Sequence, residues 1–85
     1  MEYTLFTYPN CEKCREVKSY LKERQIKYEE VNAGLGEGKV KFRDFYSQNK
    51  DKIHRENDGS ILLPIFKYNG TILQGLEGII GNINP

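Results

Sequence analysis

The chain has 85 residues, a formal net charge of +1 and 29% charged residues. This length suits one domain spanning residues 1–85, and the balanced charge excludes an electrostatic case for nucleic-acid or anionic-membrane partners. No apolar run approaches the roughly 20 residues of a membrane span, and the basic-then-apolar pattern of a signal peptide is missing, so we expect a cytoplasmic protein.

The first predicted unit joins a strand to a helix through two cysteines. Residues 3–8 are rich in aromatic and β-branched side chains and predict a strand that ends at the following proline. Across residues 11–24, apolar side chains recur at spacings of three and four, which predicts a helix with Asn10 as its N-cap. On this helix we expect Cys14 to face inward and Cys11 to lie at the exposed tip.

The next segment completes a βαβ unit and leads into a second helix. Residues 26–31 predict a short strand parallel to the first, residues 33–38 a glycine-rich loop, and residues 39–54 an amphipathic helix. The loop resembles a phosphate-binding loop. However, Ala33 stands where that motif needs glycine, and Val40 stands where Ser or Thr would hold magnesium, so we interpret the loop as a connector.

A hairpin and a short helix end the chain. Asn69-Gly70 separates two apolar runs, residues 65–68 and 71–73, and predicts a tight two-residue turn. Residues 75–83 place apolar side chains at helical spacing, although two internal glycines weaken the pattern. The order β-α-β-α-β-β-α predicts an α/β fold with a four-stranded mixed sheet flanked by about three helices.

The two cysteines carry the chemistry that the sequence suggests. A helix start concentrates free N–H groups and the positive end of the helix dipole, which favour thiolate over thiol. We therefore predict for Cys11 a pKa below the roughly 8.5 of a free cysteine, and the thiolate is the form that attacks disulfides. An alternative is a non-enzymatic module in which Cys11 and Cys14 hold zinc or an iron–sulfur cluster at a subunit interface, because a closed site needs about four ligands. His54 is the single histidine of the chain, and we interpret it as solvated or helix-capping.

Two stretches together resemble a known family. Tyr8-Pro9-Asn10-Cys11-Glu12-Lys13-Cys14 follows the first strand, and Leu63-Pro64-Ile65-Phe66 precedes the hairpin. Over essentially the whole chain this resembles the glutaredoxin-like branch of the thioredoxin fold. The resemblance implies a thiol–disulfide oxidoreductase with Cys11 as nucleophile and Cys14 as resolving thiol, which reduces protein or small-molecule disulfides.

The resemblance also suggests a substrate site. It implies that Pro64 is a cis-proline facing the cysteines and that Leu63 offers backbone groups to the bound thiol substrate. From the residues alone, we instead interpret Pro64 as a trans proline on an edge strand. Tyr8 lies beside the cysteine motif, where it could line a substrate groove.

The implied partners are a disulfide-containing protein or glutathione, together with a reductase as electron donor. No bound cofactor is needed, because electrons pass through the two thiols, and we expect a monomer. Many glutaredoxins hold glutathione with paired glycines and an acid after the fourth strand, whereas this chain has Gln74-Gly75-Leu76-Glu77. Glutathione and thioredoxin reductase therefore both stay open as electron donors. Arsenate reductase-like regulators begin similarly, but they are longer and usually carry arginine where Leu63 stands.

Overall fold

The computed structural model describes residues 3–83, which form a four-stranded mixed sheet and three α-helices. In chain order the elements are β1 (Tyr3–Thr7), α1 (Glu12–Glu23), β2 (Glu29–Asn32), α2 (Gly36–Asn49), the 3₁₀ turn η1 (Lys50–Lys52), β3 (Ile65–Tyr68), β4 (Thr71–Gln74) and α3 (Gly75–Ile80). The strand order is β2-β1-β3-β4, in which β1 runs parallel to β2 and antiparallel to β3. The predicted α/β fold is confirmed.

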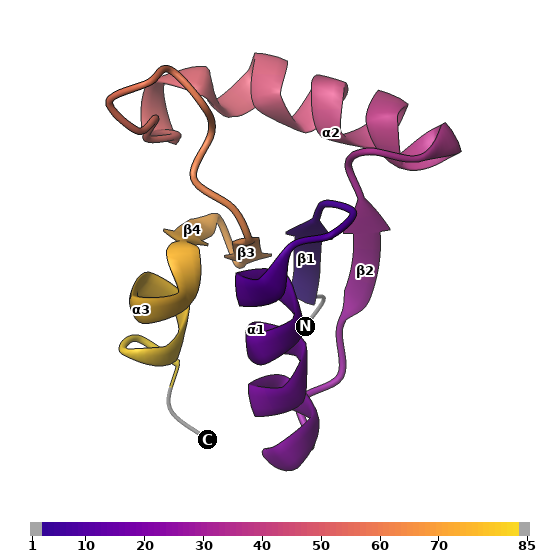
Figure 1. Ribbon diagram of the computed structural model, residues 1–85, viewed down its shortest axis with the longest axis vertical. Helices are drawn as coiled ribbons and strands as arrows, with labels where there is room; N and C mark the ends of the chain where they lie inside the picture. Colours follow the sequence, from indigo (N-terminus) through magenta and orange to yellow (C-terminus); the bar gives the residue numbers. More distant parts are fainter. Residues whose placement is uncertain (1–2, 84–85) are drawn as a thin grey trace.

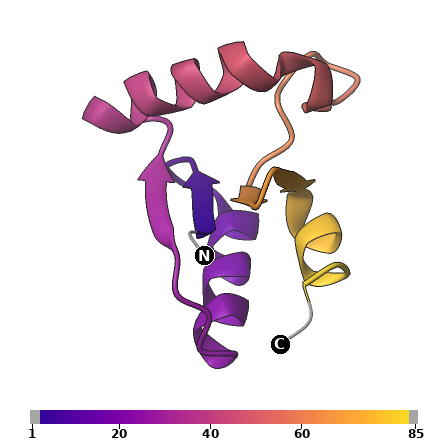
Figure 2. The same ribbon diagram turned by 180° about the vertical axis from the view of Figure 1, so that it is seen from behind.

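The helices cover both faces of the sheet. Helices α1 and α3 pack on one face, and α2 crosses the other (Figures 1 and 2). Successive side chains of a strand point to opposite faces, so adjacent residues serve different cores. Leu5 and Phe66 pack beneath α1 and α3, whereas Phe6 and Ile65 pack beneath α2.

Strand β2 starts three residues later than the predicted 26–31 because α1 ends in a tight backbone turn. Gln25 adopts the left-handed conformation, with φ 57°. The Ile26 amide then donates to the Leu21 carbonyl at 2.9 Å, as at many helix C-termini. Ile26 therefore closes the helix and packs against the core instead of entering the sheet.

Helix α2 lies earlier than the predicted 39–54, and the predicted loop 33–38 is wrong after Leu35. The Gly38 amide donates to the Leu35 carbonyl at 2.9 Å, which starts the helix directly after a short turn. A side chain at Gly38 would overlap the backbone carbonyl of Asn32, so this glycine allows close packing rather than flexibility. The helix ends at Asn49, before η1 and the buried Ile53.

The hairpin between β3 and β4 is confirmed. Its turn residues, Asn69 and Gly70, have φ values of 47° and 78°, which suit a tight turn with two left-handed residues. Helix α3 ends at Ile80, about one turn before the predicted residue 83. Within residues 3–83, every helix is too short or too polar to span a membrane.

Candidate active site

The cysteine motif lies where β1 passes into α1. Cys11, not Asn10, is the N-cap, and its Sγ accepts the backbone N–H of Cys14 at 3.1 Å. The predicted cap is wrong because Asn10 adopts a left-handed turn, with φ 58°, that delays the helix by one residue. The reactive sulfur therefore satisfies one of the free amides at the helix start.

The two sulfurs have different surroundings. Cys11 and Cys14 are joined by a disulfide, with 5.2 Å between their Cα atoms. Cys14 is 2% exposed, whereas Cys11 is half-buried at the start of the helix. An incoming disulfide can therefore reach one sulfur directly, and the second sulfur lies within bonding distance of the first.

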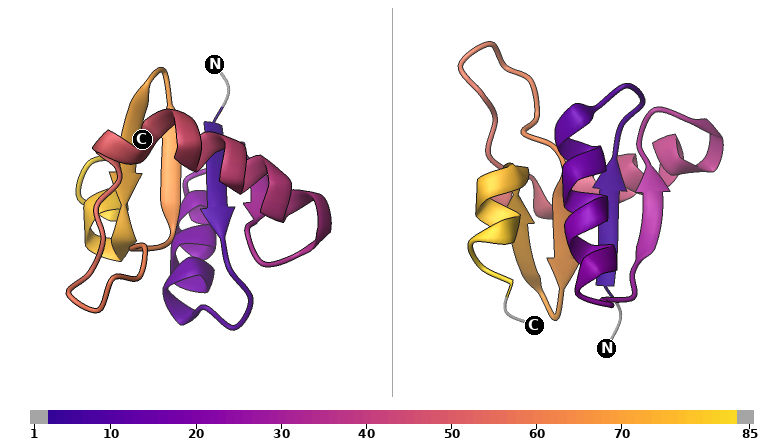
Figure 3. Two further views of the ribbon diagram at one scale, coloured as in Figure 1. Left: turned by 90° about the horizontal axis from the view of Figure 1, so that it is seen from above. Right: turned by 60° about the horizontal axis from the view of Figure 1, so that its bottom comes forward.

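A groove of about 520 Å³ runs beside Cys11. Its walls come from the loop after β1 and the loop before β3, which lie at the same end of the sheet as the start of α1 (Figure 3). Tyr8, which is 53% exposed, lies along it with Phe42 of α2 and with Ile61. The groove is thus open, largely apolar and next to the accessible sulfur.

The two residues expected opposite the cysteines are placed differently. Leu63 lines the groove, whereas Pro64 is fully buried behind it and contributes no groove surface. The Leu63–Pro64 peptide bond is cis, as the resemblance implies. The Pro64 carbonyl accepts the Gly75 amide at 2.9 Å, so it is already paired with the start of α3.

Gln74, the last residue of β4, holds the loop that forms one groove wall, and sequence reasoning missed it. Its Oε1 accepts the His54 amide at 2.7 Å, and its Nε2 donates to the carbonyls of His54 and Leu62, both at 3.0 Å. The two ends of the loop are thereby tied to the edge of the sheet. No local signal marked this role, because the partners of Gln74 lie 12 and 20 residues away in the sequence.

The same loop supplies two of the polar residues that line the groove, Glu56 and Ser60. Lys13 and Glu56 lie along the groove as a cation and an anion. Hydrogen bonds from the hydroxyl and then the amide of Ser60 lower the pKa of Asp58.

His54 is exposed and lies beyond the end of α2, so its side chain does not cap that helix. Within residues 3–83, no three His, Cys, Asp or Glu side chains cluster in a way that could hold a metal ion.

Known structures share this fold at low sequence identity. NrdH-redoxin from Escherichia coli, a glutaredoxin-like protein described as having a thioredoxin-like activity profile, is 16% identical with a TM-score of 0.68; the match covers 100% of this chain and 97% of that one. Glutaredoxin 1 from Francisella tularensis, in complex with cacodylate, is 17% identical with a TM-score of 0.66 over 95% and 90% of the two chains. An ArsC family related protein from Bacteroides fragilis is 19% identical with a TM-score of 0.54 over 88% and 90%.

Of the two sequence comparisons, only the one with family models finds a match. No curated protein matches the chain in a sequence search. The glutaredoxin family model matches residues 3–45, about half of the chain, and this stretch includes β1, the cysteine motif and most of α2. The chain therefore belongs to the glutaredoxin family.

Proposed function

We propose that the protein is a thiol–disulfide oxidoreductase in which Cys11 attacks the substrate and Cys14 resolves the product. One observation carries the proposal. The half-buried Cys11 sulfur lies at the start of α1 beside an open groove, and the buried Cys14 sulfur is within bonding distance. The glutaredoxin fold with its CxxC pair supports the same chemistry.

The proposed reaction has two exchange steps. The Cys14 amide and the positive N-terminal end of α1 stabilise the Cys11 thiolate. This thiolate attacks a substrate disulfide and forms a mixed disulfide, while the first substrate sulfur leaves as a thiolate. Cys14 then attacks Cys11 Sγ and releases the second substrate thiolate. The product is the Cys11–Cys14 disulfide that the structure contains.

The groove favours a protein disulfide as substrate. Tyr8, Phe42 and Ile61 offer apolar surface beside Cys11, and the Leu63 backbone would meet the chain that carries the substrate sulfur. The charged groups along the groove are one cation, Lys13, and one anion, Glu56, which is a poor match for both carboxylates of glutathione. The thioredoxin-like activity profile of the E. coli redoxin supports this choice.

Reduction of insulin disulfides by the wild type and by two serine variants tests the two roles. We expect Cys11→Ser to abolish reduction. We expect Cys14→Ser to attack once and stop, so that mass spectrometry finds it covalently bound to substrate. Ser47→Ala, an exposed position on α2, is the control and should behave as the wild type. Full activity of Cys11→Ser would overturn the proposal.

A coupled assay identifies the electron donor. The protein is supplied in parallel with glutathione plus glutathione reductase and with thioredoxin reductase. We expect thioredoxin reductase to regenerate the dithiol faster, with the protein working as a monomer. Faster regeneration by glutathione would show that the groove accepts this anion despite Glu56, and it would reverse the proposed choice of substrate.

A further inference from the structure

A second, smaller pocket reaches the buried cysteine. Its volume is about 210 Å³, and it lies against both Cys11 and Cys14. Its walls also come from β1, β2 and α1 through the side chains of Thr7, Glu30 and Lys18. The reaction described above uses none of these three residues.

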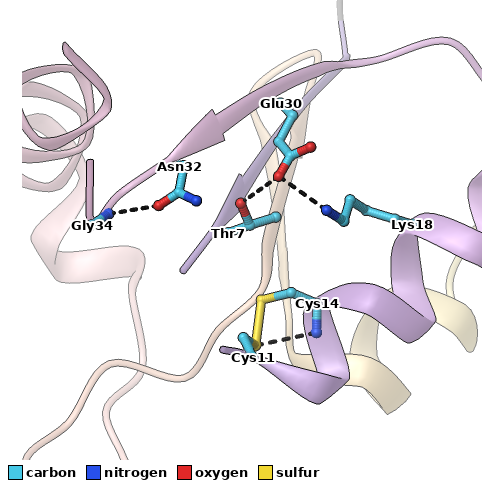
Figure 4. Close-up of a disulfide and its surroundings, with 7 residues drawn as sticks. All are labelled: Thr7, Cys11, Cys14, Lys18, Glu30, Asn32 and Gly34. Atoms are coloured by element: carbon cyan, nitrogen blue, oxygen red, sulfur yellow. Dashed lines mark hydrogen bonds and ion pairs between the residues drawn. A yellow bond between two sulfur atoms is a disulfide. The ribbon is translucent and has the colours of Figure 1, made fainter. Parts of the chain in front are cut away.

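The three residues form a connected polar group. Thr7 is 2% exposed and is the one buried polar side chain that residues 3–83 contain. Its hydroxyl donates to Glu30 Oε2 at 2.8 Å, and Lys18 Nζ lies 3.3 Å from the same oxygen. Figure 4 shows Thr7, Glu30 and Lys18 gathered on one side of the disulfide. The carboxylate of Glu30, which is exposed to solvent on its other side, therefore lines the same pocket as the two cysteines.

The buried sulfur needs a group of this kind. Cys14 must lose a proton to attack Cys11, and burial disfavours its charged form. We propose that Glu30 accepts this proton across the pocket, with Thr7 holding the carboxylate and Lys18 balancing its charge. The inference rests on the function proposed above.

The proton of the Cys14 thiol moves to the Glu30 carboxylate through the Thr7 hydroxyl or solvent in the pocket. The electron pair of the Cys14 sulfur forms the bond to Cys11 Sγ, and the bond from Cys11 to the substrate sulfur breaks. The substrate sulfur leaves with that electron pair and takes a proton from solvent. The two cysteines are oxidised, and the substrate is reduced.

Four other charged or titratable residues near the pocket do not fit the role. Arg15 and Lys18 of α1 line it as cations and accept no proton. Tyr28 of the adjoining loop holds its proton, because burial and then the Glu30 charge raise its pKa. Glu29 points to the opposite face of the sheet, where it pairs with Lys41 of α2 at 3.3 Å.

Two charge-neutralising variants of neighbouring residues test the inference. Glu30→Gln keeps an oxygen for the Thr7 hydroxyl but removes the proton acceptor. Glu29→Gln removes an equal charge from the same strand on the other face. Reduced protein reacts with substoichiometric Ellman's reagent in stopped flow. The first release of coloured thiolate reports the attack by Cys11, and the second reports the attack by Cys14.

We expect Glu30→Gln to slow the second release by about 100-fold, within the range of general base catalysis, and to leave the first release unchanged. In Glu30→Gln, the rate of the second release should rise about tenfold per pH unit between about pH 6 and 8, because this range lies below the pKa of the thiol. In the wild type and in Glu29→Gln, the rate of the second release should vary less with pH. A merely electrostatic role predicts the opposite sign. Losing a negative charge near Cys14 would lower the pKa of its thiol and speed the second release.

An unchanged or faster second release in Glu30→Gln would overturn the inference. Circular dichroism establishes that each variant is folded. Thr7→Val, which replaces the hydroxyl with a methyl group of similar size, should slow the same phase. The proposed function fails separately, if Cys11→Ser still reduces insulin. Normal cysteine-dependent reduction with an unaffected Glu30→Gln variant would reject the proton acceptor alone.

Discussion

Replacing Gln74 tests whether the groove depends on a single side chain. Gln74 makes three hydrogen bonds to backbone groups of His54 and Leu62. Each such bond contributes about 0.5–1.5 kcal/mol, but water can replace part of the bonding at the exposed His54. We therefore expect Gln74→Ala to lower the free energy of unfolding by about 1–3 kcal/mol.

The loss should concentrate in the loop between η1 and β3. This loop lacks regular structure apart from one bridge between Arg55 and Ile61, so Gln74 is a main anchor of its ends. Amide hydrogen exchange should speed in residues 54–62 more than in β1, because local opening needs less free energy than global unfolding. The rate of insulin reduction should fall as the groove wall moves.

Gln74→Glu separates the donor from the acceptor. The introduced carboxylate would still accept the His54 amide, but it would face the carbonyls of His54 and Leu62 without a proton to donate. Repulsion raises its folded pKa above the unfolded value of about 4.3. The destabilisation should therefore be complete above the folded pKa and disappear as the pH falls below the unfolded one.

Urea unfolding of the variants, each at several pH values, measures these effects. Gln48→Ala is the matched control, because Gln48 is exposed on α2, where alanine favours the helix. If Gln74→Ala unfolds at the same urea concentration as the wild type and keeps its activity, the anchoring role of Gln74 is wrong. A Gln74→Glu stability loss that grows on acidification would contradict the reasoning on its donors.

Three further predictions concern single groups. In Cys14→Ser, ultraviolet titration should place the pKa of Cys11 below about 8.5, because its Sγ accepts an amide at the helix start; a midpoint at or above that value would contradict this. Ser60→Ala should raise the pKa of Asp58, because hydrogen bonds from Ser60 lower this pKa in the wild type; carboxyl NMR measures the change. In the wild type, the Asp58 carboxylate stabilises the fold above its unfolded pKa, and this stabilisation is lost as the pH falls through the folded pKa. Phe45→Ala should cost about 3–5 kcal/mol in urea unfolding, because Phe45 is buried and stacks on Phe6 at 4.4 Å; a loss below about 1 kcal/mol would refute this.

Local patterns were sufficient for the elements but not for their ends. The Asn69-Gly70 turn was predictable because its chemistry is contained in two residues. The boundaries failed where a left-handed residue intervened, at Asn10 and Gln25, since neither position is a glycine that would mark such a turn. The start of α2 failed because Gly38 serves packing against Asn32, a contact that no local pattern contains.

The candidate site divides in the same way. The cysteine pair and Leu63 could be predicted because the motifs that carry them are contiguous. Gln74 could not, because its partners lie 12 and 20 residues away across the sheet edge. The bond between Thr7 and Glu30 spans 23 residues and joins parallel strands. Such contacts follow from the register of the sheet and not from the spacing of residues along the chain.

That register is nevertheless fixed by ordinary core packing. Val31 is buried beneath α2 with Phe6, which lies opposite it in the parallel pairing of β1 and β2. Because side chains alternate along a strand, burying Val31 and Phe6 on one face forces Glu30 and Thr7 onto the other, next to the cysteine pair. A shift of β2 by one residue would exchange the faces of its side chains. The apolar core beneath α2 therefore determines which carboxylate lines the pocket beside the buried sulfur, and Val31, which is not part of that pocket, helps to position it.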